Sequence, residues 1–163
     1  MTLPREAQLL GASSAALEVK GSGADTVVRL QADAQRKLAA LISSTSTGEF
    51  AGALYLGLEN VRGTFDAAVL NTYINLPTDA RPADHPDLRA ESVALYGLRR
   101  ASMPQGETQA EGLTFLLDIT PILVRLIASK SFHADELRVT LIPDRPLPES
   151  VTIVVGRISI FSA

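Results

Sequence analysis

The sequence predicts an all-β fold: an antiparallel β-sandwich with one or two short helices. In many short segments apolar residues alternate with polar ones, which is typical of half-buried strands. Stretches rich in Gly, Pro and polar residues separate these segments, as turns and loops between strands do. Because 163 residues with a hydrophobic fraction of 46% suffice for one core, we expect residues 1–163 to form a single domain.

The strands follow from this alternation, taken in chain order. Leu54, Leu56 and Leu58 share one face of their segment, and the next segment repeats the pattern with the sequence VLNTYINLP. The sequence KGSGA predicts a hairpin turn, whereas the proline-rich PTDARPADHPDL predicts a surface connection. SSTSTGE and RRASMPQGETQAEG are expected to be polar loops. The expected strands are residues 16–19, 25–30, 53–63, 69–77, 92–98, 113–119, 137–143 and 151–161.

Two segments have helical spacing instead. Apolar residues recur every three or four positions from residue 34 to residue 46, and Asp33 precedes them as the expected N-cap. The second helix is expected to begin at the sequence TPILVRLIASKSF. There Thr120 would cap the backbone amides, and Pro121 would take the first helical position, where its missing N–H costs nothing.

Composition excludes several classes of protein. The net charge of −3 provides no basic face, so we expect no nucleic-acid partner. The absence of cysteine excludes disulfides, thiolate metal sites and a cysteine nucleophile. No stretch approaches the roughly 18 uncharged apolar residues of a membrane span, and the first residues lack the pattern of a signal peptide. We therefore expect a soluble chain. The sequence does not indicate its cellular compartment.

The sequence contains few residues that could support catalysis. His85 and His133 are the two histidines, and a metal site that they would form with nearby aspartates stays open beside the simpler interpretation of solvated loop residues. Ser92 and Ser102 lack the Gly-x-Ser-x-Gly context of a hydrolase nucleophile. Asp118 is interpreted as a residue that shapes the start of the second helix, with a catalytic carboxylate as the alternative.

Several segments together resemble a known family. They are LLGAS, LYLGLENVRGTFDAAVLNTYINLP, ADHPDLRAESVALYGLRRAS, GLTFLLDITPILVRL, LRVTLIP and VTIVVGRISIF, in order from about Gln8 to Phe161. In these segments the chain resembles the C-terminal domain of tyrosinases and polyphenol oxidases, particularly the bacterial forms related to the plant enzymes.

The resemblance implies a function without catalysis in this chain. In that family a β-sandwich packs against a catalytic domain in which six histidines hold two copper ions, and it covers the active site in the latent enzyme. This chain has two histidines and cannot build that site, so copper is expected in the partner and no cofactor here. The expected partner is a tyrosinase-type catalytic domain, in cis or in trans.

The residue that would face the partner is a separate question. Met103, in the loop ASMPQGE, is the first candidate to fill the phenol pocket, because an apolar and flexible side chain can do so without being oxidised as a phenol would. Phe50 and Phe132 are alternatives, and all three could instead be minor packing residues. A different class also stays open: a self-assembling structural or interaction module that pairs its edge strands into a homo-oligomer.

Overall fold

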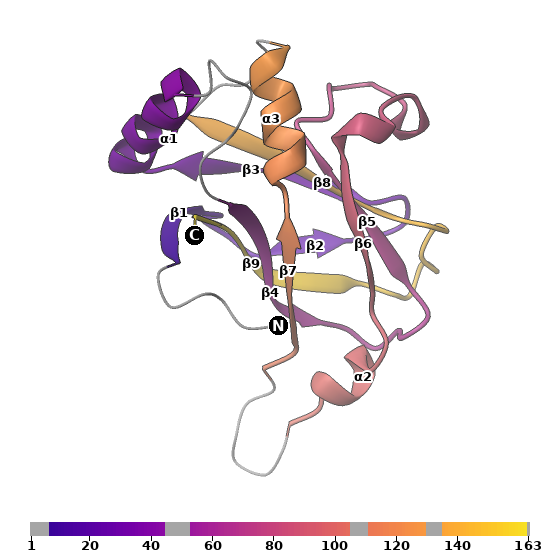
Figure 1. Cartoon of the computed structure of the whole chain (residues 1–163). Coiled ribbons are helices and arrows are strands. Elements are labelled where there is room, and N and C mark those ends of the chain that lie inside the picture. The colour runs from indigo at the N-terminus through magenta and orange to yellow at the C-terminus, as the bar shows by residue number, and fades with distance from the viewer. Residues whose placement is uncertain (1–6, 45–52, 105–110, 130–134, 163) are drawn as a thin grey trace.

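The computed structural model describes residues 7–44, 53–104, 111–129 and 135–162, and the all-β class is confirmed. Within these ranges nine strands form one sheet, with two α-helices at one end of it and a short third helix at the other (Figure 1). The helices are α1 Ala32–Ser44, α2 Leu98–Ala101 and α3 Thr120–Ala128, with two 3₁₀ turns, η2 Pro82–Asp84 and η3 Pro86–Leu88. The strands are β1 Gln8–Ala12, β2 Leu17–Val19, β3 Ala24–Leu30, β4 Leu54–Arg62, β5 Val69–Ile74, β6 Arg89–Ala94, β7 Leu113–Asp118, β8 Glu136–Pro143 and β9 Ile153–Ser162.

Every described strand pairing is antiparallel. The strand order is β6-β5-β8-β3-β1-β9-β4-β7, and β2 extends the line of β1 by pairing with the other half of β9. The two edge strands, β6 and β7, contact each other, so the sheet curls until it nearly closes. The two layers expected of a sandwich are therefore two parts of one curled sheet.

The inner face of the curled sheet forms the core, as the alternation predicts. On β8, Leu137, Val139 and Leu141 are fully buried while the residues between them are half-buried. Every described strand and α-helix contributes to one cluster of buried apolar residues. Burial of a Leu, Ile or Val side chain stabilises the fold by about 1.5–3 kcal/mol, so this cluster is the main source of stability.

The two longest strands bend together at one point. Asn60 of β4 has a positive φ of 55°, and the register places it beside Gly156 of β9. A Cβ atom at Gly156 would lie 2.9 Å from the Cβ atom of Asn60, closer than real Cβ contacts allow. Glycine at this position therefore lets the two backbones approach, and the inward-facing residues continue on the far side of the bend with Val61 and Val155.

The helix starts differ from the expectation. Helix α1 begins at Ala32, so Asp33 lies in its first turn and the N-cap prediction is wrong. In α3 the N-cap is Ile119, and no side chain caps it. The Thr120 hydroxyl instead accepts a hydrogen bond from the Leu54 backbone N–H at 2.8 Å, while the Asp118 carboxylate accepts one from the Thr120 N–H at 2.9 Å. Asp118 therefore shapes the start of α3, as interpreted.

Several local predictions were incomplete or wrong. The strand expected at residues 92–98 ends at Ala94, and the polar loop expected after it contains the end of α2. β1 was not predicted as a strand at all. The first two residues of the expected loop SSTSTGE, Ser43 and Ser44, instead end α1. Its residues 45–49, with Phe50, Phe132 and His133, lie outside the described residues. No helix in the described ranges has the length and apolar character needed to cross a bilayer.

Thr72 of β5 provides a test of the core. Its side chain is fully buried, and within the described part of the chain its hydroxyl has no hydrogen-bond partner. Because a buried hydroxyl without a partner loses its hydration, Thr72→Val should raise the free energy of unfolding by about 1 kcal/mol. Chemical denaturation measures this change. Thr140→Val, at a half-buried outward position of β8, is the matched control and should have a much smaller effect; a Thr72→Val protein less stable than the wild type would contradict the assignment.

Candidate partner-binding surface

The end of the molecule that carries α2 lies far from α1 and α3 (Figure 1). β4 connects the two ends. Its first residue, Leu54, is hydrogen-bonded to Thr120 at the start of α3, and Gly63 follows its last residue near α2. Nine residues of strand span about 30 Å. At the far end the Gly63 N–H donates to the Ser102 hydroxyl at 2.9 Å, and this hydroxyl donates to the Leu98 carbonyl at 2.7 Å. Ser102 thus joins α2 to the segment after β4. These two hydrogen bonds give its hydroxyl a structural role.

Two large apolar side chains are exposed in the described part of the chain, and both flank α2. Tyr96 precedes the helix and is 89% exposed, and Met103 follows it and is 58% exposed. Buried apolar groups hold the segment between them, since Leu98 is fully buried in the core. Single exposed apolar residues are common on proteins, so exposure alone does not define a binding site.

The backbone around Tyr96 forms a tight turn. The Leu98 N–H donates to the Leu95 carbonyl at 3.0 Å, and Gly97 has φ 83° and ψ 3°. These angles are those of the third position of a type II turn, a position that favours glycine because φ is positive. Leu95 and Leu98, the two ends of the turn, are both fully buried. Tyr96 therefore projects from a corner whose two ends are fixed in the core.

The loop after β4 supports this turn on both sides. The Leu95 N–H donates to the Ala68 carbonyl at 3.0 Å, and the Arg99 N–H donates to the Asp66 carboxylate at 2.6 Å. The same loop lines a hollow of about 280 Å³, whose other wall is the loop between β8 and β9. We call this region the α2 surface: Tyr96, Met103 and the hollow lined by Phe65, Ala67, Ala68 and residues 144–148.

A second hollow has a volume of about 320 Å³. It lies between the β2–β3 turn, β8 and the loop after β5. Its one arginine is already engaged, because Arg138 donates to the Thr78 hydroxyl at 2.7 Å and pairs with Asp25 at 3.8 Å. These contacts join neighbouring segments of the chain and leave no evident group aimed at a ligand.

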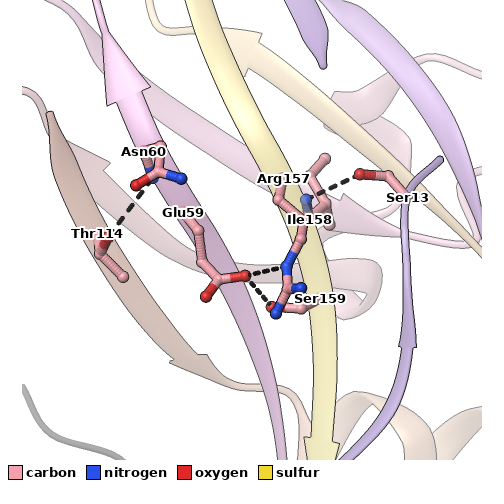
Figure 2. A network of polar contacts seen from close by, with 7 residues as sticks. All are labelled: Ser13, Glu59, Asn60, Thr114, Arg157, Ile158 and Ser159. Atoms are coloured by element: carbon pink, nitrogen blue, oxygen red, sulfur yellow. Dashed lines mark hydrogen bonds and ion pairs between the residues drawn. The ribbon is translucent and has the colours of Figure 1, made fainter. Parts of the chain in front are cut away.

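The polar network of Figure 2 is also structural. The Glu59 carboxylate accepts hydrogen bonds from Arg157 Nε at 2.6 Å and from the Ser159 hydroxyl at 2.9 Å, which joins β4 to β9. The Ser13 hydroxyl accepts one from the Ile158 N–H at 2.9 Å, which joins the residue after β1 to β9. Because Ser159 is fully buried, its hydroxyl cannot meet a substrate.

The other residues considered for chemistry lie apart. His85 lies in the connection between η2 and η3, and the described residues contain no cluster of three or more His, Asp or Glu side chains that could hold a metal ion. The site of His85 with His133 stays a prediction, because His133 is not described. Ser92 is exposed and donates to the Asn71 side chain at 2.6 Å. Met103 is exposed, as expected of a loop residue. The sequence analysis did not identify Tyr96 as exposed. The glycine that follows it, Gly97, was the available signal for a turn at this position.

Solved structures of plant enzymes share this fold. The chain matches a latent aurone synthase, a polyphenol oxidase, with a TM-score of 0.54 and 14% identity over 90% of this chain and 25% of that one. It matches a latent apple tyrosinase with a TM-score of 0.53 and 18% identity over 89% of this chain and 27% of that one. The fold is therefore that of the C-terminal region of these polyphenol oxidases.

Sequence comparisons agree with the fold. Over 70 residues the chain is 37% identical to the tyrosinase HcTyr1 of Hahella sp. (strain CCB-MM4), a match that covers 43% of this chain and 15% of the relative. The resemblance to a tyrosinase-family C-terminal domain is thus confirmed. The chain belongs to the family described as domain of unknown function (DUF7868), whose model matches residues 6–163. It spans a small part of the tyrosinase that it matches.

Proposed function

We propose that this chain is a non-catalytic domain that covers the dicopper site of a tyrosinase-type catalytic domain and keeps that enzyme latent. The observation that carries the proposal is the match of about 90% of the chain to part of two enzymes described as latent. In each match the chain corresponds to about a quarter of the longer protein, so the remainder is available for catalysis.

The residues of this chain support a role without catalysis. Two histidines in 163 residues cannot supply the six that hold two copper ions in the family, so no copper step is assigned to this chain. The polar groups of Figure 2 bond to one another across the sheet. Among these groups, the ion pair of Glu59 with Arg157 at 2.6 Å joins two strands, as a structural contact does.

The α2 surface is the region that we assign to the partner. Tyr and Met side chains are enriched at interfaces, and a hollow offers shape complementarity to a partner. The hollow here is lined by the loop that holds the turn at Tyr96. Met103, 58% exposed and followed by Pro104, is the proposed partner-facing side chain at this surface. Phe50 and Phe132 stay alternatives from the sequence.

The position of the α2 surface matters if the catalytic domain belongs to the same polypeptide. Gln8 pairs with Ser162, and Leu54 pairs with the same residue, so β1 begins and β9 ends at the end of the sheet far from α2. A catalytic domain joined ahead of Gln8 must extend about 30 Å along the sheet to reach the α2 surface. Linkage would raise the effective concentration, so that even a weak docking contact suffices for latency.

Inhibition of a catalytic domain tests the proposal directly. This chain would be titrated into a copper-loaded tyrosinase catalytic domain from the same source, and catechol oxidation would be followed. A lid predicts saturable inhibition. Absence of both inhibition and binding at high concentration would contradict it. A concentration-dependent oligomer of the chain alone would then favour the self-assembling module, in which β6 and β7, the strands that end the described sheet order, would pair with another copy.

Substitution of Met103 tests the assigned surface. Met103→Ala should weaken inhibition by about fivefold, equivalent to about 1 kcal/mol of lost contact, without a change in thermal stability, because the side chain is exposed. Arg36→Ala, at an exposed position of α1 at the opposite end, is the matched control and should inhibit as the wild type does. Equal inhibition by Met103→Ala and the wild type would remove Met103 from the interface, and Phe50→Ala and Phe132→Ala would then be tested.

A further inference from the structure

We propose that this chain pairs with a second copy of itself through the α2 surface, so that Tyr96 of each copy is seated in the hollow of the other. The pairing concerns the chain alone and therefore goes beyond the proposed function. The exposed ring and the hollow near it fit each other across a twofold axis.

The α2 surface carries one projecting ring on a rigid base. Tyr96 is 89% exposed, whereas the other two tyrosines are used by the fold: Tyr73 is 7% exposed, and Tyr55 is half-buried on β4. The turn at Leu95–Leu98, which carries Tyr96, is closed by its own hydrogen bond and is bonded to the loop after β4 on both sides. A side chain presented from a fixed turn loses little entropy when it docks, and tyrosine has few rotatable bonds to order.

The hollow has the size and the lining for such a ring. Its volume is about 280 Å³, whereas pockets for drug-sized ligands begin at roughly 300 Å³, so one large side chain is a suitable occupant. The carboxylate of Asp144 lines it and makes no hydrogen bond or ion pair with a described residue, so it can accept a hydrogen bond from a tyrosine hydroxyl. The other lining residues are mostly apolar: Phe65, Ala67, Ala68, Arg145, Pro146, Leu147 and Pro148.

Hydrogen bonds hold the far wall of the hollow in place. The Asp144 N–H donates to the Val69 carbonyl at 2.9 Å, and the Leu147 N–H donates to the Gly21 carbonyl at 2.8 Å. The loop between β8 and β9 is thus attached to two different parts of the sheet. Because the hollow is already formed in the single chain, an entering side chain does not have to order it first.

The ring and the hollow lie close to each other on the same chain. The Ala68 carbonyl accepts a hydrogen bond from the Leu95 N–H at 3.0 Å, and the next carbonyl, that of Val69, accepts the one from Asp144. Neighbouring strands are about 4.8 Å apart, so the turn and the far wall are separated by about 10 Å. A twofold axis between them places each Tyr96 at the hollow of the other copy, which is the reciprocal contact of an isologous dimer.

The charges around both places are compatible with this pairing. Exposed side chains of both signs lie beside the turn, at Asp66, Arg99 and Arg100, and at the hollow, at Asp144 and Arg145. In the twofold arrangement the charges beside one turn meet those at the hollow of the other copy. Arginines therefore find a carboxylate across the interface, and no surface of a single sign faces itself.

The area involved predicts a weak dimer. A tyrosine ring buries about 150–250 Å², so two rings supply a minority of the roughly 1,200 Å² that a stable interface buries. Met103, 58% exposed at the other end of α2, would add to the contact. Monomer and dimer should therefore exchange. A copy whose α2 surface is paired could not also cover a catalytic domain by that surface; this consequence alone rests on the proposed function.

Sedimentation equilibrium of the chain alone, over a series of concentrations, tests the pairing. Tyr96→Ala removes both rings, and Ala67→Trp, at an exposed position that lines the hollow, fills both hollows; each should raise the dissociation constant of the dimer about tenfold or more. An equimolar mixture of the two variants restores one ring facing one open hollow, so it should contain more dimer than either variant alone at the same total concentration. Arg36→Ala, on α1 at the opposite end, is the matched control and should dimerise as the wild type does.

Three results would overturn the inference. They are a wild type that stays monomeric at every concentration, a dimer that Tyr96→Ala and Ala67→Trp leave unchanged, and a mixture of these variants with no more dimer than either alone. Restored dimer in the mixture also excludes misfolding as the cause of the loss, because unfolded chains could not restore it. The catalytic domain takes no part in the experiment, so the pairing can fail while the proposed function stands, and the reverse.

Discussion

The fold depends on the pairing of β9 with neighbours on both sides. β9 is the longest strand, and it pairs with β4 along one edge and with β1 and β2 along the other. Without it the sheet would separate into a part ending at β1 and a second part of β4 and β7. Its inward side chains, among them Ile153, Val155 and Ile158, are fully buried. The last strand of the chain thus completes the core, which explains why it carries no chemistry.

The same ladder positions the α2 surface. β4 is held by β9 on one edge and β7 on the other, and its last residues connect to the loop that supports Tyr96 and lines the hollow. Because this loop is attached to a strand that is paired along both of its edges, the turn at Leu95–Leu98 has a rigid base. A binding surface built from loops on such a scaffold is a common arrangement in β-proteins.

The sequence predicted the parts of the fold that have a clear period. Alternation identified β4, β5, β7, β8 and β9, and helical spacing identified α3 with buried Ile122 and Leu123. β1 was missed because a five-residue strand containing Gly11 carries too little pattern, and its pairing with β3 and β9 is a long-range property. Met103 was singled out from its loop composition. Tyr96 was absorbed into an apolar run, since burial of Leu95 and Leu98 and exposure of the residue between them become visible only in three dimensions.

Hydrogen exchange of the backbone amides, with and without a saturating copper-loaded catalytic domain, tests most directly whether the α2 surface meets the partner. The account predicts slower exchange on binding in residues 95–103 and in the loop at residues 63–68, with α1 and α3 unchanged. Slower exchange confined to α1 and α3, at the opposite end of the sheet, would contradict it.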